Sequence, residues 1–132
     1  MNEISTFSKQ LIFDYLTSQL RHKETRFSET GKYYIEMVGE FFEEFKEGIN
    51  SILNPGKKYS GNENWREITE AVIGRKDPTR KDLREGVIKA GKIEKQLEKM
   101  VKEPEKFYRT KDSQELFEIC KRLREVYNSK KV

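Results

Sequence analysis

The feature that most constrains the fold is a pattern of apolar side chains recurring at three- and four-residue steps. It is clearest over residues 32–53, where its members are Tyr34, Val38, Phe41, Phe42, Phe45, Ile49 and Ile52. This spacing places the apolar side chains on one side of an α-helix. No segment of useful length shows the two-residue alternation of a β-strand, so the chain is predicted to be all-α.

Two helices are predicted in the first half of the chain. The first covers residues 4–20 and has near-helical apolar spacing at Ile4, Phe7, Leu11, Leu16 and Leu20. The polar stretch 21–31 is predicted to be a loop, and the second helix covers residues 32–53. The sequence Asn-Pro-Gly at 54–56 ends that helix, because proline restricts the residue before it and glycine permits a turn. Residues 57–63 form a second predicted loop.

Three helices are predicted in the second half. A short helix over 65–73 has Asn64 and Glu67 at capping positions and ends at Gly74. The fourth helix follows residues 77–79, with Pro78 in its first turn and Thr79 or Asp77 as its cap, and it ends at Pro104. The fifth begins near residue 112 or 113, with Glu115 placed for a capping box. The simplest architecture is an antiparallel helical bundle of four main helices plus one short helix.

Composition favours one domain covering residues 1–132. The chain is 34% hydrophobic and 38% charged, which gives a modest core under a highly charged surface. It has no apolar run of about 18 residues and no basic segment before an apolar N-terminal run, so neither a membrane span nor a signal peptide is expected. Cys120 is the single cysteine and falls on a predicted buried face. A lone thiol fits a reducing compartment, and the expected setting is the cytoplasm.

Charge is segregated along the chain. Residues 74–102 carry ten basic and five acidic side chains, whereas residues 1–50 carry six basic and nine acidic ones. At about 100° per residue, six cations of the fourth helix fall on the side opposite its apolar face. We call them the basic row; they are Lys81, Arg84, Lys92, Lys95, Lys99 and Lys102. The row is about 32 Å long at 1.5 Å per residue.

The second helix shows the reverse pattern. Its outward side carries an acidic row, which consists of Glu36, Glu40, Glu43 and Glu47. Outward helix faces are often only solvated, but like charges along one face repel each other, whereas mixed charges would attract. An anionic partner on the basic row, or a protein partner on the acidic row, would offset that repulsion.

A basic row of this length is suited to following a nucleic-acid backbone, with affinity gained by counterion release. More candidate contacts lie nearby in the sequence, namely Arg75, Lys76, Lys57, Lys58 and Tyr59. An exposed Tyr59 ring could stack on a base, although packing of this ring onto the bundle is the alternative. The sequence indicates neither DNA nor RNA in particular.

Few catalytic arrangements are available. His22 is the only histidine, so with Cys120 it makes no zinc set or supported nucleophile–base pair. Two E-x-x-E units, at residues 40–43 and 67–70, resemble the paired acidic motifs with which all-α NTP pyrophosphatases bind magnesium. The resemblance covers these two motifs, and the second has Glu70 where that family usually has Asp.

The sequence therefore favours a non-enzymatic helical subunit of a nucleoprotein assembly that needs no cofactor or metal. In this hypothesis the basic row contacts the backbone of DNA or RNA, and the acidic row faces protein, which includes another copy of the chain. A protein–protein adaptor without nucleic acid is the alternative. A magnesium-dependent pyrophosphatase is the remote one.

Overall fold

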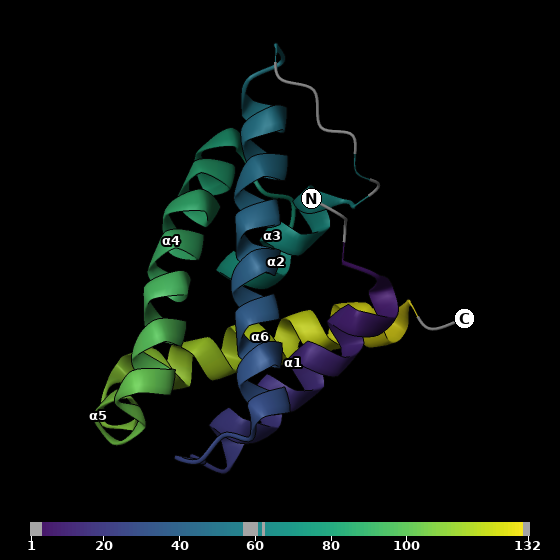
Figure 1. Ribbon diagram of the computed structural model, residues 1–132. Helices are drawn as coiled ribbons and strands as arrows, with labels where there is room; N and C mark the ends of the chain where they lie inside the picture. Colours follow the sequence, from purple (N-terminus) through teal and green to yellow (C-terminus); the bar gives the residue numbers. More distant parts are fainter. Residues whose placement is uncertain (1–3, 57–60, 62, 131–132) are drawn as a thin grey trace.

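The computed structural model describes residues 4–56, 61 and 63–130, and this part of the chain is all-α as predicted. Figure 1 shows the helices of these residues, which are α1 (Thr6–Arg21), α2 (Glu29–Leu53), α3 (Trp65–Ile73), α4 (Arg80–Lys102), α5 (Pro104–Tyr108) and α6 (Lys111–Ser129). None of these helices is long and apolar enough to cross a membrane.

Helices α2 and α4 form an antiparallel pair. Lys46 Nζ lies 2.6 Å from Glu94 Oε1 near the middle of the pair. Near one end, the Arg80 guanidinium donates to the Leu53 carbonyl at 2.9 Å. The two helices lie side by side in Figure 1, so their outward faces belong to one surface of the molecule.

Helices α1 and α6 form a second antiparallel pair, which crosses the first (Figure 1). The Gln10 amide donates to the Tyr127 carbonyl at 2.8 Å, and Arg124 Nε lies 2.6 Å from Asp14 Oδ1. Helix α3 packs against α2, α4 and α6. The predicted antiparallel bundle is thus refined to two antiparallel pairs that cross each other, with α3 against both of them.

The predicted apolar stripe of the first helix is wrong in part. Phe7 is 67% exposed and Leu11 is 39% exposed, whereas Ile12 and Phe13 are fully buried. The predicted stripe combined residues from two sides of the helix, and only tertiary packing shows which side is covered. Leu16 and Leu20 are buried as expected.

Several helix ends also differ from the prediction. Helix α2 begins inside the predicted loop 21–31, because the Ser28 hydroxyl caps it by accepting from the Gly31 N–H at 3.0 Å. Helix α4 is capped by a reciprocal box between Thr79 and Asp82, so Pro78 precedes the cap instead of lying in the first turn.

Directly after α4 lies a short helix that was not predicted from the sequence. Pro104 does end α4, but it also starts the five-residue helix α5. Helix α6 follows, and its N-terminus at Lys111 has no side-chain capping bond, so the capping box expected at Glu115 is absent.

The prediction for α3 is confirmed at both ends. The Asn64 side chain accepts from the Glu67 N–H at 3.3 Å, and Gly74 ends the helix with a left-handed φ of 75°. The buried Trp65 ring at the start of α3 occupies the space that a side chain on Gly48 of α2 would need. Glycine at position 48 therefore permits the close contact between α2 and α3.

A buried ion pair joins the two helix pairs near the N-terminus of α1. Lys9 Nζ lies 2.6 Å from Glu63 Oε2, and the two side chains are only 2% and 7% exposed. The Lys9 ammonium also lies 5.9 Å from the centre of the Phe41 ring and 5.4 Å from that of Tyr127. One cation thus connects α1, α2, α6 and the segment before α3.

Glu63 is held as a carboxylate by several neighbours. The Tyr127 hydroxyl donates to Oε2 at 3.1 Å, and Lys130 Nζ lies 3.3 Å from Oε1. Burial by itself would raise the pKa of Glu63, but the hydrogen bond and charge of Lys9, together with Lys130, bring its pKa below the ordinary value. The charged form of Glu63 therefore stabilises the fold.

We predict that Gly48→Ala lowers the free energy of unfolding by about 1–3 kcal/mol, because the new methyl group forces the Trp65 ring to move. The matched control is Gly39→Ala on the same helix, where a methyl group meets no atom within 4 Å. That variant is expected to gain up to about 1 kcal/mol from helix propensity. Urea unfolding followed by circular dichroism measures both, and equal effects at the two positions would contradict the packing described for Trp65.

We also predict a pH-dependent stability that Glu63→Gln weakens. Because the pKa of Glu63 is lowered in the folded state, its stabilisation is present above the ordinary carboxyl pKa and is lost as the pH falls through the lowered value. The free energy of unfolding should therefore drop more steeply between about pH 5 and pH 3 in the unmodified chain than in Glu63→Gln. If the free energy of unfolding falls with pH equally steeply in both proteins, Glu63 is not the group that causes the pH dependence. Glu105→Gln, at an exposed carboxyl on α5, is the control for loss of one charge.

Candidate nucleic-acid interface

Helix α4 presents the basic row on the outward surface of the α2–α4 pair. Its opposite side is buried in the core through Leu83, Gly86, Ala90, Ile93, Leu97 and Met100. Because α4 continues unbroken from Arg80 to Lys102, the cations that alternate with these core positions face away from the bundle. All six side chains of the basic row are exposed.

The charges of the basic row are not compensated within the described residues. No carboxylate of residues 4–56, 61 and 63–130 forms an ion pair with any of these six cations. In contrast, Lys89 on the flank of the same helix lies 3.2 Å from Glu115 of α6. Within the described part of the chain, Lys89, which α4 turns toward α6, is thus paired, whereas the six cations of the basic row are not.

Arg75 is exposed, but its charge is shared locally. Its Nη2 lies 2.9 Å from Asp82 Oδ1 and 2.9 Å from Glu85 Oε2. The guanidinium donates hydrogen bonds to Asp82 and Glu85, which raises its pKa, and the Thr79 backbone together with Arg75 lowers the pKa of Asp82. Arg75 therefore contributes less unpaired positive charge than a single cation of the basic row does. Lys76 is exposed, and the other candidates, Lys57, Lys58 and Tyr59, lie outside the described residues.

The acidic row lies on α2, next to the basic row. All four of its carboxylates are exposed. Glu43 lies 2.9 Å from Lys46 Nζ, and the same ammonium contacts Glu94 of α4. Burial and the nearby Glu43 carboxyl raise the pKa of Glu94, while Lys46 acts in the opposite direction. This cluster occupies the boundary between the two helices, so it links them, and Glu43 is the member of the acidic row that it pairs with a cation.

Helical geometry places the two rows on the same side of the molecule. At about 100° per residue, the acidic row lies about a quarter-turn from Lys46, the residue of α2 that reaches α4. The basic row lies about a third of a turn from Glu94, the residue of α4 that reaches α2, in the same rotational sense. Since the helices are antiparallel, both rotations lead to the same outward surface, where strips of opposite sign run side by side.

One exposed apolar side chain interrupts the basic row, and it was not among the site residues predicted from the sequence. Ile88 is 64% exposed. It lies four residues after Arg84 and four before Lys92, so it occupies the position in the row where a cation would continue the pattern. The sequence contained a usable signal, because Ile88 is the apolar residue of α4 at the register of the cations.

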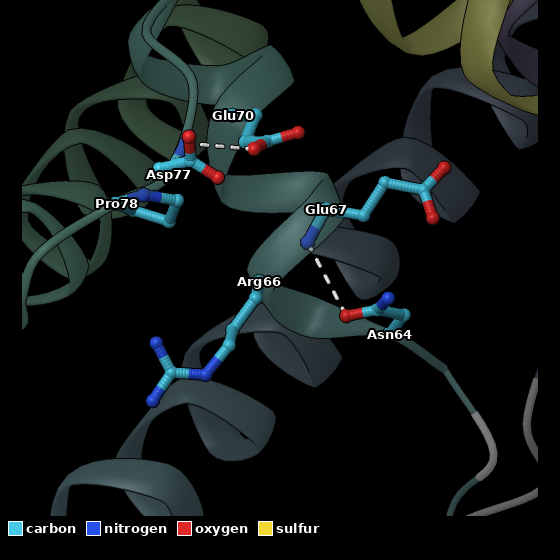
Figure 2. Close-up of a pocket in the computed structure, with 6 residues that line it drawn as sticks. All are labelled: Asn64, Arg66, Glu67, Glu70, Asp77 and Pro78. Carbon is cyan, nitrogen blue, oxygen red and sulfur yellow. Dashed lines mark hydrogen bonds between the residues drawn. The ribbon is translucent and has the colours of Figure 1, made fainter.

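The two E-x-x-E units lie on different helices and do not form one cluster. Glu40 and Glu43 are on the exposed side of α2, while Glu67 and Glu70 line an open hollow of about 500 Å³ beside α3. Figure 2 shows that the side chains of this hollow spread outward, and that the Glu70 carboxylate accepts from the Asp77 N–H at 2.8 Å. In the described part of the chain, no group of three or more His, Cys, Asp or Glu side chains could hold a metal ion.

The thiol of Cys120 and the imidazole of His22 do not form a catalytic site. Cys120 is fully buried as predicted, and this burial raises the pKa of its thiol, which disfavours the reactive thiolate. His22 follows the last residue of α1 and is exposed. Neither group has the exposed position next to an activating partner that nucleophilic catalysis requires.

Comparisons of the chain with protein-family models, with curated proteins and with solved structures find no match. The candidate functional site is therefore defined by its surface geometry, in which a row of cations without ion-pair partners among the described residues lies beside a row of carboxylates.

Proposed function

We propose that this protein is a non-enzymatic helical subunit of a nucleoprotein assembly, and that its basic row holds the backbone of DNA or RNA. The observation that carries the proposal is the set of six exposed cations on α4, which have no ion-pair partner among the described residues. The rigid helix keeps them in line over about 32 Å. A phosphate backbone supplies anions at regular intervals, and its binding releases condensed counterions.

The energetics of the row support an anionic ligand. Neighbouring members such as Lys92, Lys95 and Lys99 are three or four residues apart, a spacing at which like charges on a helix repel by about 0.2–0.5 kcal/mol per pair. Pairing with carboxylates of the same chain would remove that cost, and this is what happens at Lys89. The basic row has no such pairing, so phosphates from a ligand would offset the repulsion.

The acidic row is the proposed protein-facing surface. Because both rows lie on one side of the molecule, two copies that face each other across a twofold axis parallel to α2 and α4 would place each acidic row against the partner's basic row. Such a contact is isologous and closed, whereas contacts between rows on opposite sides would generate rings or filaments. Self-association of this kind is the second candidate function, and it would compete with nucleic acid for the basic row.

We predict that reversing three charges of the basic row abolishes nucleic-acid binding. The variant replaces Lys92, Lys95 and Lys99 with Glu, and binding of fluorescent 30-mers is measured at about 50 mM salt and over a salt series. The unmodified chain should bind, with log K falling linearly with log salt. The charge-reversed variant should lose at least about 100-fold in affinity and most of the salt slope.

A matched control distinguishes the effect of where the charges lie from the effect of the change in net charge. Replacing Arg26, Arg109 and Lys121 with Glu makes the same change in net charge at exposed positions away from α4, and we expect it to reduce affinity far less. If both triple variants bind equally well, the basic row is not the site. If the unmodified chain binds no 30-mer and its mass in solution doubles at low salt, self-association replaces the nucleoprotein role.

A further inference from the structure

The basic row is narrow, because a row of carboxylates flanks it on one side and a surface of mixed charge flanks it on the other. The acidic row of α2 lies on one side, and packed helix axes are about 8–10 Å apart. On the other side, a hollow of about 180 Å³ lies between α4 and α6, and its charged lining is mixed, with the carboxylates Glu85, Asp112 and Glu115 beside Lys89 and Lys92. The positive strip is therefore about one helix wide.

This width discriminates between nucleic-acid forms. In a duplex, the second strand lies across a groove about 6 Å (minor) or 12 Å (major) wide. A duplex with one strand on the basic row would therefore bring phosphates of the other strand over the acidic row of α2, or over the mixed charges beside α6, where no continuous positive surface attracts them. Like charges at that distance repel, and α4 cannot enter a groove because α2 lies beside it in the same layer. A single strand has no second row of phosphates.

The exposed Ile88 supports the same conclusion. Its side chain cannot pair with a phosphate, yet it lies between Arg84 and Lys92 in the middle of the row. In a duplex the base faces are stacked inside, whereas in a single strand they are free to lie on an apolar or aromatic side chain. The row thus combines cations for the backbone with one apolar contact that a base can use.

We infer that the basic row selects single-stranded over duplex nucleic acid, an inference that depends on the proposed function. The selection comes from repulsion as well as attraction. The basic row attracts any polyanion, and the carboxylates beside it repel the second strand of a duplex. DNA and RNA single strands share the chemistry used here, and the experiment below tests each.

The test compares fluorescent 30-mers of single-stranded DNA, single-stranded RNA and the two corresponding duplexes at about 50 mM salt. At least one kind of single strand should bind about tenfold tighter than its duplex. Replacing Glu36, Glu40 and Glu47 with Gln should raise duplex affinity more than single-strand affinity and so reduce this ratio. Glu43 is left unchanged because it contacts Lys46.

The control variant replaces Glu24, Glu105 and Glu125 with Gln, which removes the same charge at exposed positions of other segments, and the ratio should remain that of the unmodified chain. Equal or tighter binding of duplex by the unmodified chain overturns the strand selection and leaves the proposed function in place. Failure to bind any of the four ligands overturns the proposed function itself.

A second variant tests the base contact separately. Ile88→Ala should lower single-strand affinity severalfold and leave the salt slope unchanged, because no phosphate contact is lost. Lys95→Ala should instead reduce the slope by about 0.7 for a single strand. The exposed position of Ile88 means that thermal stability should stay the same. Unchanged affinity of Ile88→Ala would remove the base contact from the inference.

Discussion

The buried contact between Lys9 and Glu63 is the constraint on which the arrangement of the helices depends. A charge removed from water must find a partner, because an unpaired buried ion costs several kcal/mol. Lys9 meets this requirement with a carboxylate from the segment before α3 and with the Phe41 and Tyr127 rings. These contacts fix α1 and α6 against α2 at one place, and a polar interaction of this kind has stricter geometry than apolar packing.

The arrangement decides which surfaces remain open. With the α1–α6 pair and α3 on the inner side of α2 and α4, the outer side of these two helices is left without a covering element (Figure 1). Lys46 and Glu94 hold α2 and α4 together at the boundary, and the outward side carries the basic row on α4 and the acidic row on α2. The candidate function therefore belongs to an extended surface with two parallel strips, and the open polar hollow beside α3 contributes no converging set of side chains.

The spacing of apolar and capping residues along the chain predicted much of the fold. It failed where the same short segment fitted two different structures about equally well. The stripe of α2 was unambiguous, since Val38, Phe41 and Phe45 are all fully buried. In α1, Phe7 and Leu11 fit one helical stripe and Ile12 and Phe13 fit another, so periodicity alone could not select the buried side. The short helix α5 was missed because proline can both end one helix and begin the next.

The sequence by itself determined the all-α class, most helix positions and the existence of one basic and one acidic helix side, because these follow from residues close together in the chain. Tertiary structure decided that the two sides lie next to each other on one surface, since this depends on how α2 and α4 pair. It also decided that Lys9 is buried. A lysine side chain ordinarily stays in water, and only contacts between segments distant in sequence determine where a buried one lies.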